Sequence, residues 1–425
     1  MPGRSERLGV WGPFRGPHVI MIPVPRPTLE RRWLIVAALF TVTFGVSNPI
    51  AAFGVFLPVL SDAFGWSRGA IAVAHSINML LGGVVGFGVG AIADRSGPRV
   101  VLTATVLVAG IGFALGGSVR TLWHFYFFLG VMVGIGASGL YILSTSTIVR
   151  WFAERRGLAL GTVLTGFNLG FVTGGPTAAF LIERFGWRTA YVVLGMAVCC
   201  VGGVAGLWVR DPPPGIGPDR AALLRGRTDR SGMTFRQALM DGRLWLIAAS
   251  WLLLGSVFMM LMVHIVPYAR DRGISLERAS LALTAYGVGA VSGRVLLGAS
   301  SDRLSAMATM RWCVLIQVAS LATLLAGPRQ WIAALLLMVF GFGFAGADTI
   351  VVKVVPEVFG VRALGAIMGV LTFAWRCGAA LGPATAGFLY DATGSYMIPF
   401  AAAPALLIVS FLLFAYGAAP SLRRA

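Results

Sequence analysis

Two arginines stand inside apolar segments of this chain. Arg294 lies within "GAVSGRVLLGASSDR", residues 289–303, and Arg376 lies near the middle of the apolar run 364–389. A guanidinium keeps its charge on burial, and its planar N–H groups fit a carboxylate with two hydrogen bonds. These residues therefore predict a substrate-binding site for a small organic anion, and a dianion could neutralise both charges.

Asp348 is the one acidic residue placed well inside an apolar segment, 331–353. Two interpretations of it are open: it carries a coupling proton, or it balances one of the arginines. Each arginine likewise has an alternative interpretation, in which it pairs with backbone carbonyls or with Asp348 and serves the structure alone.

Further candidates for the wall of an anion site are aromatic or polar residues of the apolar segments: Phe373, Tyr141, Asn168 and Tyr286. His75 and His264 could titrate near neutral pH, although a hydrogen-bonded packing role is the simpler interpretation. The four cysteines have no metal-ligand spacing. No Ser/His/Asp, metal-ligand or paired-carboxylate group is visible in the apolar segments, so we predict neither an enzyme, nor a metal, nor a cofactor.

The elements that carry these residues are predicted from composition. The 425 residues are 57% hydrophobic and 12% charged, whereas soluble domains are about a quarter charged. Nearly uncharged windows of the length that spans a bilayer core about 30 Å thick recur along the chain. They cover residues 33–58, 69–91, 100–118, 122–147, 158–182, 188–209, 244–267, 278–300, 311–326, 331–353, 364–389 and 396–416. We predict an all-α polytopic membrane protein with twelve transmembrane helices.

The net charge of +18 is placed asymmetrically. Of 34 Lys and Arg, 24 fall in the two tails and in the loops after even-numbered windows, eight in the loops after odd-numbered windows, and two inside windows. This matches the positive-inside rule with both termini in the cytoplasm of a bacterial-type inner membrane. No basic soluble domain is available for nucleic acid, so the predicted partners are the lipid bilayer and the anion.

The chain divides into two halves. A Pro- and Arg-rich segment, 210–243, separates a first half, 33–209, from a second half, 244–417, with tails at 1–32 and 418–425; Met1 or Met21 is the start. "GAIADR", residues 90–95, falls on "GASSDR", residues 298–303, at an offset of 208. We interpret the halves as parallel repeats with a substrate site between them. Arg294 falls on Gly86 in this register, so it has no counterpart in the first half.

The turn "GAIADRSGPRVVL" resembles the signature loop of the major facilitator superfamily. Its matching residues are Gly90, Asp94, Arg95, Gly97 and Arg99, with an echo at Asp302 and Arg303. The resemblance implies a transporter with alternating access, in which these residues act as a gate. Three further motifs, "RWFAERRGLALG", "FGWR" and "LGPATAGFLYDATGSY", resemble the branch of monocarboxylate transporters and the oxalate and formate antiporter. That branch places a basic residue at the positions of Arg294 and, usually as lysine, of Arg376.

The chain departs from the branch at two places. Proton-coupled members usually have an Asp four residues before the first of these basic residues, where this chain has Ala290, and a lysine in the first span, where it has none. This argues against proton symport by that arrangement and favours anion exchange or facilitated diffusion. We predict a secondary active or facilitative carboxylate transporter that functions as a monomer. The alternatives are an efflux transporter for drugs or siderophores and a membrane sensor that does not transport.

Overall fold

The computed structural model describes residues 29–152, 155–210, 232–303, 305–327, 330–360 and 362–419. The first part of the chain forms α1 (Leu29–Ala51), α2 (Phe53–Phe64), α3 (Arg68–Ser96), α4 (Pro98–Gly116), α5 (Leu122–Phe125), the π-helix η1 (Tyr126–Met132), α6 (Val133–Ser138), α7 (Leu140–Trp151), α8 (Arg156–Ala197), the π-helix η2 (Val198–Gly202) and α9 (Gly203–Trp208). The second part forms α11 (Phe235–Met240), α12 (Gly242–Arg270), α13 (Leu276–Arg303), α14 (Ala306–Leu325), α15 (Gln330–Phe359), α16 (Leu364–Thr393) and α17 (Met397–Ala418).

The fold is all-α, as predicted. Within the described ranges the only strand-like pairing is an isolated bridge between Gly232 and Gly360. Ten helical segments of these ranges are long and apolar enough to cross a membrane. The count of twelve spans stays a prediction, because two of the expected spans lie in one continuous segment and α13 is not among the ten.

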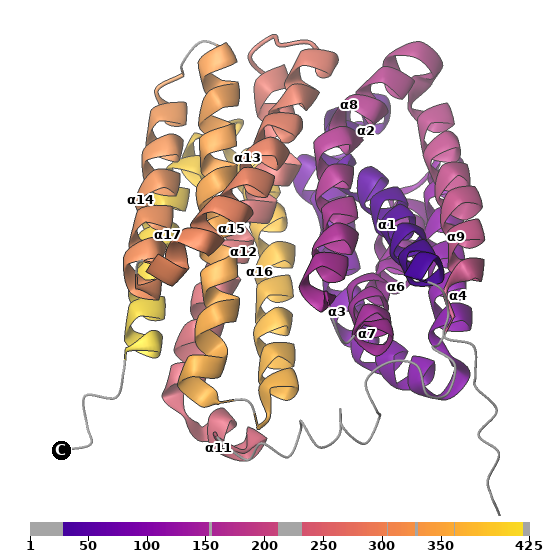
Figure 1. Ribbon diagram of the computed structural model, residues 1–425. Helices are drawn as coiled ribbons and strands as arrows, with labels where there is room; N and C mark the ends of the chain where they lie inside the picture. The colour runs from indigo at the N-terminus through magenta and orange to yellow at the C-terminus, as the bar shows by residue number, and fades with distance from the viewer. Residues whose placement is uncertain are drawn as a thin grey trace, which may run out of the picture.

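The continuous segment, Leu158–Trp208, has 51 residues. A straight helix of that length would reach about 75 Å, more than twice the thickness of the bilayer core. Gly186 interrupts it with φ 79°, a conformation that favours glycine. The chain therefore turns here, and Figure 1 shows the two arms of α8 running in opposite directions.

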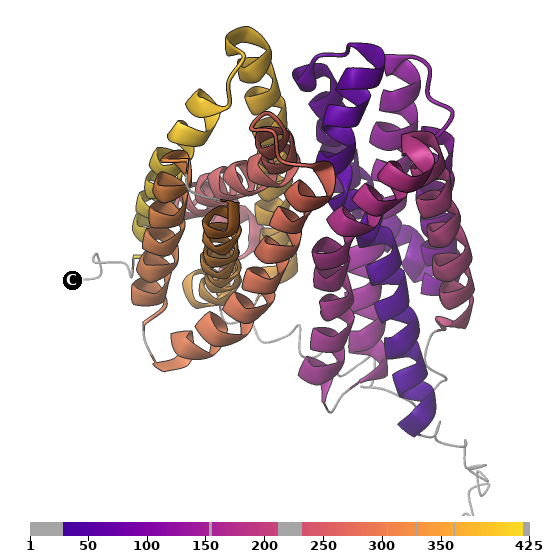
Figure 2. The same ribbon diagram turned by 90° about the horizontal axis from the view of Figure 1, so that it is seen from above.

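The helices form two groups that stand side by side, one from α1 to α9 and one from α12 to α17 (Figures 1 and 2). Three helix pairs join them: α3 with α16, α8 with α13, and α2 with α12. Glycines let the backbones approach, since a Cβ built on Gly387 would lie 2.6 Å from the Cα of Gly69. The latch end is the end of the molecule where α3 begins and α16 ends. The linker end is the opposite end, which carries α11.

The two groups are in contact near the latch end and separate toward the linker end. Along α3, Gly69 and Gly83 face Phe388 and Phe373 of α16, whereas Gly86 and Gly90, further toward the linker end, face Ile142 of α7. Along α8, Val172 packs on Gly287 of α13, whereas a Cβ added at Gly161, nearer the linker end, would meet nothing within 4 Å. The interface between the groups thus closes over part of its length only.

The predicted domain boundaries are not tested by these helices. α1 begins at Leu29, three residues before the predicted end of the N-terminal tail, and α11 lies within the segment predicted as a linker. Residues 1–28, including Met1 and Met21, and residues 211–231 and 420–425 lie outside the described residues.

Candidate functional site

Arg376 of α16 lies in the interface between the two groups of helices. Its Cδ and Nη1 occupy space left by two glycines of α3: a Cβ on Gly82 would lie 2.6 Å from Nη1, and one on Gly83 would lie 3.1 Å from Cδ. Its one hydrogen bond to a described residue is a long donation of 3.5 Å to the carbonyl oxygen of Met79. No carboxylate of the described residues pairs with it, so the guanidinium is a half-buried cation without a counter-ion in the described part of the chain.

Arg294 of α13 does have a counter-ion. Its Nη2 donates to Oδ2 of Asp348 at 3.1 Å, and Oδ1 of the same carboxylate accepts from Nε1 of Trp251 at 3.0 Å. Asp348 thereby links α12, α13 and α15. The Arg294 side chain remains 40% exposed, and because a guanidinium has five N–H donors, it retains donors for a second anion.

The two tyrosines predicted for the site lie near this ion pair. Tyr141 and Tyr286 are both within Coulombic range of Arg294 and Asp348. Tyr141 of α7 is exposed and comes from the first group of helices, whereas Tyr286 of α13 is 3% exposed. Tyr286 packs in an aromatic cluster with Phe258, Phe340 and Phe344. Of the two, Tyr141 is thus the one whose surface a substrate could reach.

The other two residues predicted to line the anion site are Phe373 of α16 and Asn168 of α8. Phe373 is one turn from Arg376 and packs on Gly83, with 36% of its surface exposed. Asn168 is half-buried on α8, one turn before Val172, which packs on Gly287 of α13. Phe373 therefore belongs to the surroundings of Arg376, while Arg294, Asp348 and Tyr141 form a second polar group.

The predicted gate is described in part, with the Arg95 side chain exposed and that of Arg99 half-buried. Gly90, Asp94 and Arg95 lie in the last turns of α3, Gly97 joins α3 to α4 with φ 82°, and Arg99 lies in the first turn of α4. The φ of Gly97 explains a glycine there. The side chains of Asp94, Asp302 and Arg303 lie outside the part of the structure that is described.

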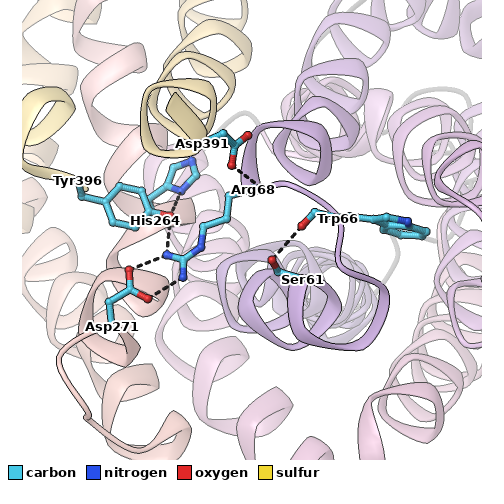
Figure 3. Close-up of polar contacts among 7 residues, drawn as sticks. All are labelled: Ser61, Trp66, Arg68, His264, Asp271, Asp391 and Tyr396. Carbon is cyan, nitrogen blue, oxygen red and sulfur yellow. Dashed lines mark hydrogen bonds and ion pairs between the residues drawn. The ribbon is translucent and has the colours of Figure 1, made fainter. Parts of the chain in front are cut away.

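A polar network that the sequence reading missed joins the two groups at the latch end (Figure 3). We call Arg68, Asp271, Asp391 and Tyr396 the latch. Arg68 of α3 donates from Nη1 and Nη2 to the two carboxylate oxygens of Asp271, at 2.7 and 2.6 Å, and from Nη1 to the Tyr396 hydroxyl at 3.1 Å. Asp271 follows α12, so the ion pair crosses from one group of helices to the other.

Asp391 makes the second crossing of the latch. The backbone amides of Arg68 and Gly69 donate to its Oδ1 and Oδ2, at 2.9 and 2.8 Å. These amides are the free donors at the N-terminus of α3, where the helix dipole also favours an anion. His264 lies behind the latch: Nδ1 shares a hydrogen bond of 2.9 Å with the Tyr396 hydroxyl, and Nε2 donates to the Pro383 carbonyl at 2.8 Å in the tautomer that this acceptor requires.

Two of the sequence motifs have a structural explanation. In "FGWR", Arg188 donates to the carbonyls of Gly117 and Val119 at 3.0 Å each, and so caps the C-terminal end of α4. In "LGPATAGFLYDATGSY", the members Asp391 and Tyr396 belong to the latch. That motif was the signal that could have led to the latch, but the partners Arg68 and Asp271 are far away in sequence.

Comparisons with known proteins agree with this architecture. The sequence model of the family described as Major Facilitator Superfamily matches residues 35–279 and 258–424. The chain is 26% identical over 432 residues to human monocarboxylate transporter 11, covering 97% of this chain and 89% of that protein. It is 27% identical over 418 residues to rat monocarboxylate transporter 12, with 90% and 85% covered.

Among solved structures, the chain resembles a bacterial homologue of the human lysosomal transporter Spinster, in an inward-facing and unoccupied conformation. The TM-score is 0.71 at 16% identity, and 92% of this chain and 96% of that chain are covered. The same homologue in an inward-facing and occupied conformation gives a TM-score of 0.67. At this identity the likeness concerns the fold.

Proposed function

The chain belongs to the Major Facilitator Superfamily, so it is a membrane transporter rather than an enzyme, and from that premise we propose that it carries a small mono- or dicarboxylate by alternating access. The observation that carries the proposal is Arg376, a half-buried cation between the two groups of helices without a carboxylate partner among the described residues. An unpaired charge that is partly withdrawn from water inside membrane helices is costly, and a bound anion would reduce that cost. The relatives named monocarboxylate transporters support this substrate class.

Arg294 and Asp348 have a different role in this proposal. Asp348 is the resident counter-ion of Arg294, which agrees with the balancing interpretation of Asp348. An entering carboxylate would compete with Asp348 for the exposed donors of Arg294. In our proposal Arg376 is the primary anion-binding residue, and Arg294, with Tyr141 nearby, completes the site for a second carboxylate group or for an intermediate position on the path.

The conformation corresponds to one of the two states of alternating access, in which one end of the interface between the helix groups is closed and the other is open. The latch closes one end, while α3 and α8 separate from α16 and α13 toward the linker end. By the positive-inside rule the linker end is cytoplasmic, together with both termini. We therefore interpret the structure as facing the cytoplasm of a bacterial-type inner membrane, which agrees with the inward-facing conformation of the solved homologue of Spinster. Opening toward the other side would require the latch to break and the linker end to close.

Counterflow in proteoliposomes tests the proposed function. The protein is reconstituted, loaded in turn with oxalate, formate and lactate, and presented with the same radiolabelled acid outside. We expect uptake of at least one acid, and a loss of apparent affinity of about tenfold to hundredfold in Arg376→Ala, because hydrogen bonds to charged groups contribute about 1.5 to 3 kcal/mol. Arg278→Ala, an exposed arginine on α13, is the matched control. Unchanged uptake in both Arg376→Ala and Arg294→Ala would remove the anion site.

Two other functions are distinguished by the same preparation. An efflux transporter for drugs or siderophores would give drug sensitivity in a deletion strain and no counterflow of small acids. A sensor would bind an acid without moving it. Neither has a specific observation in its favour comparable with the unpaired Arg376. Within the proposal, transport proceeds by exchange or by facilitated diffusion, and the transporter functions as a monomer.

A further inference from the structure

The short helix α11 is attached to the second group of helices at both of its ends. Just before the helix, the amide of Met233 donates to the carbonyl of Phe359 at the end of α15, at 2.9 Å. At the end of the helix, the carbonyl of Leu239 accepts a hydrogen bond of 2.9 Å from Nε1 of Trp245 in α12. Figure 1 shows α11 at the end of α12, α15 and α16. α11 is therefore a fixed part of the second group.

Three large apolar side chains of this region are exposed. Ala238 of α11 packs in the core and is fully buried, whereas Phe235 and Met240 are 39% and 79% exposed. Trp245, in the first turn of α12, is 54% exposed and is held against the end of α11 by its hydrogen bond to Leu239. Apolar groups gathered at one place on a surface cost free energy in water, so they indicate a surface that another apolar medium covers.

The length of α12 places α11 at the depth of the lipid headgroups. α12 has 29 residues, which reach about 44 Å at the usual helical rise. The hydrocarbon core is about 30 Å thick, and the bilayer with its headgroup layers is about 40 to 45 Å thick. The ends of α12 therefore extend into the headgroup layers, and α11 ends one residue before α12 begins. Tryptophan is enriched at this depth, which agrees with the position of Trp245.

Positive charge accompanies these apolar side chains. Arg236 of α11 and Arg362, just after the end of α15, are exposed. Neither forms an ion pair with a carboxylate within the described ranges. Of the carboxylates that adjoin them in sequence, Asp241 is paired with Arg243, and Glu357 offsets one charge. The net charge of this surface is positive, so an anionic headgroup would supply the counter-charge.

We propose that α11, together with Trp245 and Arg362, is a lipid-binding surface that anchors the second group of helices to anionic phospholipids. Phe235, Met240 and Trp245 enter the boundary between headgroups and acyl chains, while Arg236 and Arg362 bind lipid phosphate groups. Because α11 is fixed to α12 and α15, this anchor holds the second group at a set depth while the first group moves. The inference goes beyond the proposed function and does not depend on which acid is transported.

Quenching by brominated lipids tests the depth of α11. In a background without the native cysteines, Met240→Cys carries a bimane fluorophore, and the protein is reconstituted in vesicles of phosphatidylcholine with brominated acyl chains. We expect strong quenching, comparable with that of the same label at Val201→Cys, an exposed apolar residue of a membrane span. Iodide in the aqueous phase should quench both labels weakly. Strong quenching by iodide and none by the brominated lipid at Met240→Cys would show that α11 faces water, and the inference would be wrong.

The same label tests the headgroup, with brominated phosphatidylglycerol and brominated phosphatidylcholine compared at equal fractions of otherwise unbrominated lipid. Each arginine near an anionic surface raises affinity about fivefold, so phosphatidylglycerol should quench at a several-fold lower fraction, and salt should weaken this preference. Arg236→Gln combined with Arg362→Gln should lose the preference, whereas Arg278→Gln, an exposed arginine at the latch end, should keep it. Equal quenching by the two lipids, or an unchanged preference in the double variant, would overturn the assignment. Counterflow in the same vesicles reports the proposed function separately.

Discussion

Arg68 and Asp271 form a two-pronged ion pair that joins α3 to the end of α12 and closes one end of the molecule. The side chains are 13% and 33% exposed, so the pair is partly protected from water. The guanidinium also lies 4.0 Å from the ring centre of Tyr390, which adds a cation–π contact. Both features depend on the relative position of the two groups of helices, and they would be lost if the latch end opened.

Asp271→Asn should therefore shift the protein toward conformations in which the latch end is open. Because the pair is partly solvated, we expect a loss of about 1 to 2 kcal/mol, which is a change of about 5- to 30-fold in the ratio of conformations. Spin labels at Ala63→Cys and Ala392→Cys, in a background without the native cysteines, report the distance between the two groups at this end. Asp62→Asn, an exposed carboxylate on α2, is the control. An unchanged distance distribution in Asp271→Asn would mean that the pair does not hold the latch.

Stability at low pH should depend on Asp241, which precedes α12. The hydrogen bonds from the Arg243 guanidinium, together with that residue's backbone amide and charge, lower the pKa of the Asp241 carboxyl below its ordinary value. The folded pKa lies below the unfolded one, so the stabilisation is complete above the unfolded pKa, about 3.9, and is lost as the pH falls through the folded pKa. Thermal unfolding in detergent between neutral and acidic pH measures this loss.

The matched variant for this prediction is Asp241→Asn. Asparagine is as good an N-cap as aspartate, so the cap of α12 is kept while the charge is removed. We expect this variant to be less stable than the wild type at neutral pH and to converge with it at the acidic limit. Parallel curves over the whole range would show that the Asp241 charge contributes nothing to folding.

The sequence was sufficient to predict the fold class, because the length and apolarity of the helices are imposed by the bilayer and are visible in each segment separately. It also identified Arg294, Asp348 and Arg376 as the charges that need an explanation. It could not decide between the two interpretations of Arg294, since pairing with Asp348 depends on how α13 packs against α15. The choice of Arg376 as the unpaired arginine came only from the structure.

The latch was missed for a related reason. Arg68, Asp271 and Asp391 each lie at the end of a helix, where a charged residue is ordinary and carries no signal of a partner. Their meeting depends on the closure of one end of the interface between the two groups of helices. Only the motif that contains Asp391 and Tyr396 stood out in the sequence, and its resemblance to a family did not indicate the other residues of the network.

Gly82→Ala should impair transport, although the substitution adds only one methyl group. The added Cβ would lie 2.6 Å from Nη1 of Arg376, so the guanidinium would have to move out of its position. Gly88→Ala, on the same helix, adds a methyl group where nothing lies within 4 Å. Since Ala is favoured over Gly in helices by about 1 kcal/mol, Gly88→Ala should transport normally and be no less stable. Counterflow of the acid panel and thermal unfolding measure both effects, and equal transport by the two variants would show that Arg376 tolerates the displacement.

Asp348→Asn tests whether the carboxylate competes with the substrate for Arg294. The asparagine oxygen can still accept from Trp251, so the link to α12 is kept, but the negative charge that pairs with Arg294 is removed. If Asp348 is a resident counter-ion, the freed guanidinium should bind the transported acid more tightly, and the concentration giving half-maximal counterflow should fall several-fold. If Asp348 instead carries a proton that the transport step needs, counterflow at equal pH should be lost in a variant that still elutes as a folded species in detergent. The same titration in Asp348→Ala, which also removes the acceptor for Trp251, separates the loss of charge from the loss of the link between α12 and α15.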